Sequence, residues 1–150
     1  MSEPLFIKSS ITINSGASKV WNALTNPEQT KKYMFGCEAL SDWKVGSPLI
    51  WKGVFNGAEL VAVKGTIVNI TPEKLLEYTT IDPNSGVDDV PGNYLNVTYG
   101  LSEEGGQTVL TVTQGDYSKV GDGSKRYAEA VEGGGWSSIL TEIKKIVEAE

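Results

Sequence analysis

The sequence predicts an α+β domain in which a curved antiparallel sheet wraps around a long C-terminal helix. Apolar and polar residues alternate almost throughout residues 36–117, two short helical segments precede this region, and a helical period runs from about residue 122 to the end. The predicted order is therefore one strand, two helices, six strands and one helix. Residues 1–150 are a common size for one domain, and we expect a single domain.

The N-terminal segment predicts the first strand and both short helices. Every second residue from Leu5 to Ile13 points to one side, as in a half-buried strand. Helical spacing then relates Val20 to Leu24. Asn26 followed by Pro27 is typical of an N-cap and a first helical position, so a second helix is expected to begin there.

The middle of the chain predicts hairpins of antiparallel strands. Strands are expected at about 48–55 and 58–70, and the Asn56-Gly57 pair between them favours a type I′ turn. Three more strands are expected, each with its inward residues in alternation, and a polar loop at 82–92 precedes the last two. Their inward residues are Leu76, Tyr78 and Thr80; Leu95, Val97, Tyr99 and Leu101; and Leu110, Val112 and Gln114.

The C-terminal segment predicts one long helix with an apolar stripe. At about 1.5 Å per residue it could reach roughly 40 Å, enough to cross a small sheet. Gly133-Gly134-Gly135 interrupts the pattern, and each glycine costs about 1 kcal/mol relative to alanine in a helix. Either these small residues let the helix approach the sheet or bend, or they form a loop and the helix begins near Trp136. The expected stripe is Tyr127, Val131, Ile139, Leu140, Ile143, Ile146 and Val147.

Composition excludes several classes of function. Lys and Arg total 13 and Asp and Glu total 19, which gives a formal charge of −6, and there is no histidine. A nucleic-acid groove or an anionic membrane surface needs a positive footprint, so we expect neither as a partner. No continuous apolar span is long enough to cross a bilayer, so we also expect no membrane insertion. The usual Ser-His-Asp or Cys-His machinery and imidazole metal sites are excluded. An enzyme would therefore have to rely on Asp, Glu, Tyr, Lys or Cys. We assign no catalytic residue and expect no cofactor and no metal.

The cysteine content favours a reducing compartment. The single Cys37 excludes an intramolecular disulfide, and no segment typical of a signal peptide follows Met1. A cytoplasmic location is therefore expected. Cys37 begins a predicted strand and is expected to act as a small apolar side chain, because no histidine can lower its pKa.

The predicted shape leaves room for a cavity between sheet and helix. Such a cavity forms if the helix lies across the open side of the sheet without filling it. Five residues are expected to face this interior, either as ordinary core or as cavity wall. Gln114 is the most informative, because a buried amide needs partners: Tyr99 or the backbone could satisfy it, or it could orient a ligand. The five are Trp51, Tyr78, Tyr99, Gln114 and Trp136.

Residues spread along the chain carry a resemblance to a known family. They begin with Val20-Trp21, Ala23-Leu24-Thr25-Asn26-Pro27 and Tyr33, continue with Gly65, Ile67, Ile70, Pro72, Leu76, Tyr78 and Thr108–Gly115, and end with Gly135-Trp136, Leu140 and Ile143. Their order and spacing over about residues 5–147 are similar to the START-like superfamily, which has the helix-grip fold of the birch pollen allergen. Within it, the chain resembles the domain related to the C-terminal part of heat-shock chaperone ATPase activators.

The resemblance implies a pocket for a small hydrophobic or aromatic molecule. Many relatives carry lipids, sterols or aromatic compounds, some are polyketide cyclases, and a few assist the chaperone. The leading hypothesis is therefore a non-enzymatic binder, with a cyclase or dehydratase as the second and a co-chaperone-like module that binds a chaperone or another protein as the third. No family-wide catalytic set carries over. The expected ligand-binding residues are Trp51, Val63, Ile67, Tyr78, Tyr99, Gln114, Trp136 and Leu140.

Overall fold

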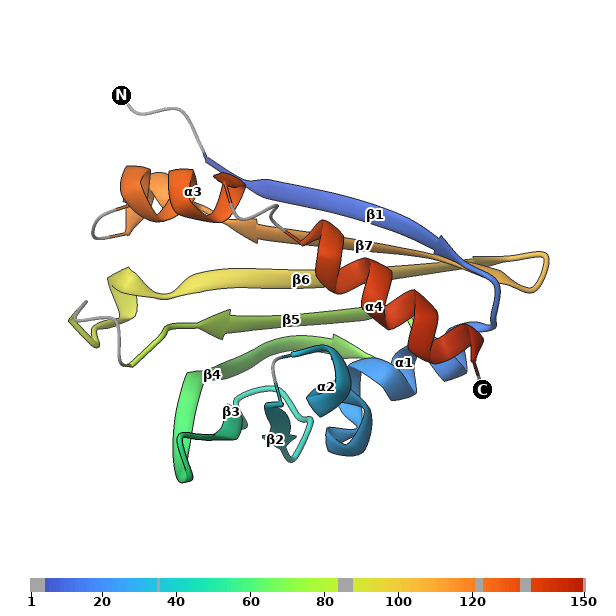
Figure 1. Ribbon diagram of the computed structural model, residues 1–150. Coiled ribbons are helices and arrows are strands. Elements are labelled where there is room, and N and C mark those ends of the chain that lie inside the picture. Colours follow the sequence, from blue (N-terminus) through green and yellow to red (C-terminus); the bar gives the residue numbers. More distant parts are fainter. Residues whose placement is uncertain (1–4, 35, 84–87, 121–122, 133–135, 150) are drawn as a thin grey trace.

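The computed structural model describes residues 5–34, 36–83, 88–120, 123–132 and 136–149. Up to β7 these residues form the predicted order of strands and helices, and a helix packs on the curved sheet, so the predicted α+β helix-grip fold class is confirmed (Figure 1). The strands are β1 (Ile7–Ile13), β2 (Glu38–Ser41), β3 (Pro48–Phe55), β4 (Ala58–Thr71), β5 (Leu75–Thr80), β6 (Leu95–Glu104) and β7 (Gln107–Gly115). The α-helices are α1 (Ala17–Thr25), α2 (Pro27–Tyr33), α3 (Gly123–Glu132) and α4 (Ser137–Glu148), with short 3₁₀ turns η1 (Pro91–Asn93) and η2 (Tyr117–Lys119).

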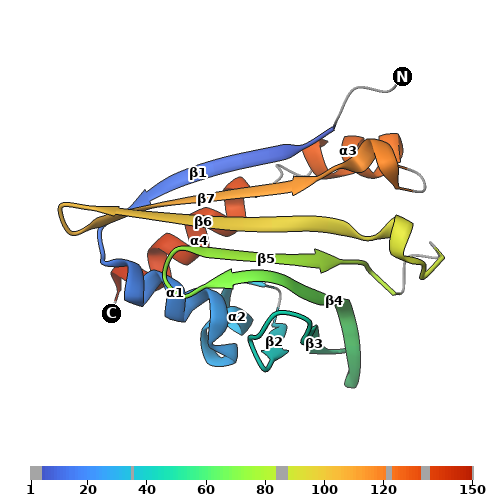
Figure 2. The same ribbon diagram turned by 180° about the vertical axis from the view of Figure 1, so that it is seen from behind.

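The described strands form one seven-stranded sheet in the order β1-β7-β6-β5-β4-β3-β2, and neighbouring strands run antiparallel. The first strand pairs with the last, so β1 forms one edge of the sheet and β2 forms the other. Helix α4 crosses one face of the sheet (Figure 1), and the view from behind shows the opposite face with α4 beyond it (Figure 2). The helix-covered face therefore contains the core.

Strand β4 bends the sheet around the helix. Its register against β3 shifts between Trp51 and Lys52, and its register against β5 shifts between Ile67 and Asn69. Each bulge adds a residue to one strand, which increases its local twist and bend. Gly65 allows the bend, because a Cβ there would lie only 1.6 Å from the carbonyl oxygen of Thr79. The curvature that makes room for a cavity is thus built into this strand.

The two short helices follow the predicted pattern. The side chain of Asn26 accepts a hydrogen bond from the backbone N–H of Glu28 at 3.0 Å, and Pro27 is the first residue of α2. Tyr33 anchors α2 to α1, because its hydroxyl donates to the carbonyl of Ala23 at 2.8 Å. These contacts hold α1 and α2 together at one end of the sheet (Figure 1).

The C-terminal segment differs from the prediction, because two helices replace the single long one. Helix α3 ends at Glu132 and α4 begins after Trp136; the second interpretation gave the start of the last helix but did not include α3. Gly133, Gly134 and Gly135 lie outside the described residues. The two helices point in different directions (Figure 1), and the predicted stripe does not continue through both.

Helix α4 provides the buried part of the stripe. Leu140, Ile143 and Val147 are almost fully buried against the sheet, as predicted. On α3, Tyr127 packs against the core, whereas Val131 is 53% exposed. Val131 was expected inside because one continuous helix would bring it to the same face. Within the described part of the chain, no helix has the length and apolar character that crossing a membrane requires.

Candidate functional site

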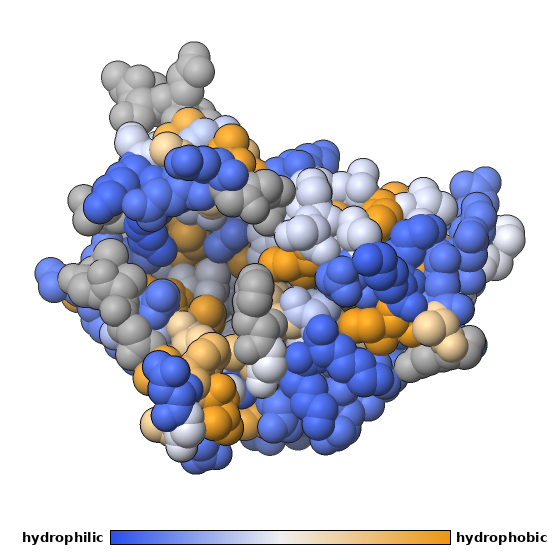
Figure 3. Space-filling view, viewed as in Figure 1, coloured by the Kyte–Doolittle hydropathy of each residue, from blue (hydrophilic) through white to orange (hydrophobic). Residues whose placement is uncertain are grey.

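A cavity of about 570 Å³ lies between the curved sheet and the helices α3 and α4. The space-filling view shows a hollow on this face, with hydrophobic residues around it (Figure 3). Its wall combines residues from β1, β3, β4, β5, β6 and β7, from the helices α3 and α4, and from the α2–β2 connection. The lining residues are Ile7, Met34, Cys37, Trp51, Phe55, Ala62, Val63, Tyr78, Thr80, Val97, Gln114, Ala130, Trp136, Ser138 and Ile139.

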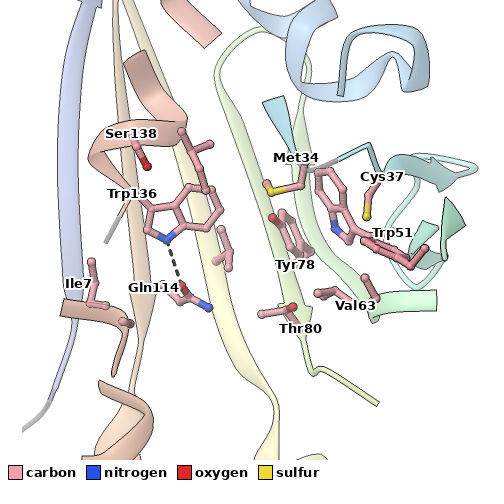
Figure 4. Close-up of a pocket in the computed structure, with 15 residues that line it drawn as sticks. Ile7, Met34, Cys37, Trp51, Val63, Tyr78, Thr80, Gln114, Trp136 and Ser138 are labelled. Atoms are coloured by element: carbon pink, nitrogen blue, oxygen red, sulfur yellow. Dashed lines mark hydrogen bonds between the residues drawn. The ribbon is translucent and has the colours of Figure 1, made fainter. Parts of the chain in front are cut away.

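The structure brings five of the eight predicted site residues into this wall. They are Trp51, Val63, Tyr78, Gln114 and Trp136 (Figure 4). The other three, Ile67, Tyr99 and Leu140, are each 1% exposed and belong to the packed core beside the cavity. Alternation along the strands and the helical period of the C-terminal segment indicate the inner face, but they do not separate the cavity wall from the core around it.

A cross-strand row forms part of the cavity wall. Ile7 on β1 is opposite Gln114 on β7, Gln114 is opposite Val97 on β6, and Val97 is opposite Tyr78 on β5. Adjacent strands lie about 4.8 Å apart, so the backbones of Gln114 and Tyr78 are separated by about 10 Å across the sheet. Apart from those two groups, the row is apolar.

The bulge in β4 adds a lining residue that the alternation did not predict. Trp51 is opposite Val63 and Lys52 is opposite Val61, which leaves Ala62 as the extra residue. Successive strand residues normally point to opposite faces. Here both Ala62 and Val63 line the cavity, because the bulge breaks the alternation.

Four aromatic side chains form a continuous chain around the cavity. The ring centroids of Trp51 and Tyr78 are 6.4 Å apart, those of Tyr78 and Tyr99 are 6.1 Å apart, and those of Tyr99 and Trp136 are 5.7 Å apart. Tyr99 and Trp136 meet edge to face, with an interplanar angle of 86°. Such pairs are favourable beyond their buried area, so the chain fixes the shape of the aromatic wall.

The partner of Gln114 is Trp136, not Tyr99 or the backbone. The indole Nε1–H donates to the amide oxygen of Gln114 at 2.9 Å (Figure 4). Sequence reasoning selected both residues as inward-facing but did not predict this bond. Trp136 follows Gln114 by 22 positions in the sequence, so the approach of the two side chains depends on tertiary structure.

The ionisable groups in and beside the cavity are kept uncharged by burial. Desolvation raises the pKa of Tyr78 and of Tyr99 well above the ordinary phenol value, and it raises the pKa of the Cys37 thiol. The hydroxyl of Tyr99 has no hydrogen-bond partner among the described residues. The described lining residues contain no carboxylate, ammonium or guanidinium group. The wall therefore presents neutral polar groups to whatever enters the cavity.

The described residues contain no group of three or more His, Cys, Asp or Glu side chains that could hold a metal. What the wall offers instead is apolar and aromatic surface with a few neutral donors. Cys37, Met34 and Phe55 contribute to it from the α2–β2 connection and from β3. Phe55 is the last residue of β3, and Met34 follows directly after α2.

Comparison with known proteins identifies the family. The profile of the family described as "Activator of Hsp90 ATPase homolog 1-like protein" matches residues 14–148, nearly the whole chain. The chain belongs to this family. Among curated proteins, none matches the chain significantly.

Solved structures of this family's fold are similar over nearly their full length. The solution structure of ChR145 from Cytophaga hutchinsonii is 33% identical, covers 99% of this chain and 97% of that one, and has a TM-score of 0.75. The Aha1 dimer from Colwellia psychrerythraea is 19% identical, with 95% and 96% coverage and a TM-score of 0.68. An Hsp90 activator from Plasmodium falciparum is 18% identical, with 96% coverage of each chain and a TM-score of 0.67. The last two show the shared fold.

Proposed function

We propose that this family member binds a small, uncharged hydrophobic or aromatic molecule in the cavity between the sheet and the C-terminal helices. The observation that carries the proposal is the cavity itself. It has a volume of about 570 Å³ and a wall of mainly apolar side chains with a few neutral polar groups. Cavities of this size and composition are typical of small-molecule sites.

The physical basis of binding is removal of apolar surface from water. Burial of apolar area contributes about 25 cal/mol per Å², and association costs offset part of this. The rings of Trp51 and Trp136 lie in the wall at opposite ends of the aromatic chain. A planar aromatic ligand can stack on or meet these rings edge-on, which favours it over an aliphatic ligand of similar size.

An enzyme of the cyclase or dehydratase kind would need a group that exchanges protons near neutral pH. Burial keeps Tyr78 and Cys37 in their neutral forms, because it raises the pKa of each. These two side chains are the titratable groups of the described wall. The arrangement therefore supports a binder more strongly than acid–base catalysis.

A protein partner is the second candidate function. The family description refers to activation of the Hsp90 ATPase, and one structure with this fold is an Hsp90 activator. A chaperone-binding role would use the outer surface and would not need a cavity. Isothermal titration against an Hsp90-type chaperone, with and without ATP, tests this candidate directly: heat of binding supports it, and its absence at high protein concentration contradicts it.

Native mass spectrometry of protein purified from its own host tests the leading proposal. A cavity of this kind should retain part of its ligand, so we expect a species heavier than the bare chain by the mass of one small organic molecule. Extraction with organic solvent should release that molecule. Recovery of the bare chain alone, combined with no binding of any apolar probe, would contradict the proposal.

A further inference from the structure

We propose that Gln114 selects ligands that carry a neutral hydrogen-bond acceptor, such as the oxygen of an aromatic ketone, quinone or ester. The inference rests on the proposed function and adds the chemical class of the ligand. The inference follows from the orientation of the Gln114 amide, which the hydrogen bond from Trp136 determines. It is supported by that hydrogen bond, by the apolar residues on either side of Gln114, and by the absence of charged side chains in the described wall.

Trp136 determines which way the Gln114 amide points. An indole N–H can donate a hydrogen bond but cannot accept one, so it can be satisfied only by the oxygen of a glutamine side chain. Trp136 occupies that oxygen at 2.9 Å. The amide nitrogen must then point the other way, and Figure 4 shows it on the cavity side of Gln114, away from the indole. Gln114 therefore presents an N–H donor to the cavity.

The neighbours on the sheet cannot use this donor. The residues opposite Gln114 are Ile7 on β1 and Val97 on β6, whose side chains are apolar. Among the described residues, the amide nitrogen has no acceptor within hydrogen-bond distance. A donor that faces an apolar cavity without a partner loses free energy when a ligand removes water from it. A ligand that supplies an acceptor avoids that loss.

The charge of the wall determines that the acceptor is neutral. A carboxylate or phosphate would accept the same hydrogen bond, but it would also lose its hydration inside an apolar cavity. Such a loss is offset when a cationic side chain lies nearby. The described wall contains none. The acceptor that fits is therefore a carbonyl or similar uncharged oxygen.

A pair of isosteric probes tests the assignment. The ketone 2-acetylnaphthalene and the hydrocarbon 2-isopropenylnaphthalene have nearly the same shape, and only the ketone carries an acceptor. Their dissociation constants are measured by displacement of N-phenyl-1-naphthylamine. Their ratio is compared between wild type and Gln114→Leu, so that the different water solubilities of the probes cancel. We expect the preference for the ketone to fall about fivefold to tenfold in Gln114→Leu, the effect of one neutral hydrogen bond.

Two further variants keep the test independent of folding defects. Gln114→Met has nearly the length of glutamine but carries no N–H donor, so it should lose the ketone preference as Gln114→Leu does. Gln107→Leu makes the same change at an exposed position of β7 outside the cavity and should keep the wild-type ratio. If the hydrocarbon binds but the ratio is unchanged in both Gln114 variants, this inference is wrong and the proposed function stands. If neither probe binds the wild type, both are wrong.

Discussion

The indole nitrogen of Trp136 lies 2.9 Å from the side-chain oxygen of Gln114, and this hydrogen bond joins the start of α4 to the strand β7. The same indole meets the ring of Tyr99 edge to face. One side chain thus fastens the helix to the sheet and sets the direction of an amide in the cavity wall. The stability of the helix–sheet contact and the chemistry of the cavity are expected to change together.

A double-mutant cycle measures how much the hydrogen bond between Trp136 and Gln114 contributes to stability. Gln114→Leu leaves the indole N–H of Trp136 without its acceptor, which costs about 1–3 kcal/mol when such a group is buried. Trp136→Phe removes the donor and some packing. In the double variant both partners are gone, so its loss should be smaller than the sum of the single losses by about 1 kcal/mol. Urea unfolding gives the four free energies, and strict additivity would show that the bond contributes nothing to stability.

The close approach of β4 to Thr79 at Gly65 predicts that adding one methyl group there strongly lowers the stability of the fold. Gly65→Ala places a Cβ about where the backbone of Thr79 lies, so the strands must separate. We expect a loss of about 3 kcal/mol or somewhat more in the free energy of unfolding, because the clash is with backbone. Gly100→Ala on β6 is the control, since a Cβ there meets no atom within 4 Å. Equal stabilities of the two variants would contradict the close approach.

Asp116 predicts a specific acid sensitivity. Its side chain accepts hydrogen bonds from the backbone N–H of Leu5 at 2.8 Å and from the backbone N–H and hydroxyl of Ser118 at 2.9 and 2.6 Å. The bonds to Ser118 and Leu5 lower the pKa of this carboxyl below its ordinary value of 3.8. The stabilisation is therefore complete above about pH 4 and is lost as the pH falls through the lower folded pKa.

Asp116→Asn tests that sensitivity. Its urea midpoint should change less than that of wild type between about pH 4 and pH 2, because no proton binds at this position. Glu104→Gln, at the exposed end of β6, is the control and should follow wild type. Parallel curves for wild type and Asp116→Asn would show that this carboxylate is not the source of the acid sensitivity.

Cys37 provides a chemical reporter of the cavity. It is the single cysteine of the chain, it is 3% exposed, and it lines the wall. Because burial raises the pKa of its thiol, modification by N-ethylmaleimide at neutral pH should be slow. A bound apolar probe should slow it further, by about tenfold when the probe is at ten times its dissociation constant. Mass spectrometry follows the reaction.

A relocated cysteine is the control for that experiment. In the Cys37→Ser background, Ser102→Cys places a thiol on the exposed side of β6. Its rate should be independent of the probe. If the probe leaves the rate at Cys37 unchanged although it binds, the probe occupies a different place on the molecule.

Much of the fold could be predicted because it depends on local patterns. Alternation placed Leu95, Val97 and Tyr99 inside, and all three are buried. Asn56 and Gly57 both have positive φ, as the predicted tight hairpin requires. Each of these features is encoded within a few residues, so tertiary contacts reinforce the local preference instead of opposing it.

The remaining features depend on contacts between distant segments. Alternation identified the inner face but could not show that Tyr99 packs under Trp136 while Tyr78 lines the cavity. The bulge that turns Ala62 inward has no signature in the sequence, because it arises from the pairing of β4 with β3. The division of the C-terminal segment into α3 and α4 was not predicted, because two successive helices and one long helix show the same helical period.

The most direct test of the account is the binding of N-phenyl-1-naphthylamine to wild type, Ala62→Phe and Val54→Phe. Ala62 lines the cavity, so a phenyl ring there occupies part of the ligand space, whereas Val54 is 67% exposed on the adjacent strand β3. We expect wild type and Val54→Phe to bind one probe molecule with similar affinity. Ala62→Phe should bind it at least tenfold more weakly, although its circular dichroism spectrum should show that it is folded. Equal affinity of all three proteins, or no binding to wild type, would contradict the claim that this cavity is the functional site.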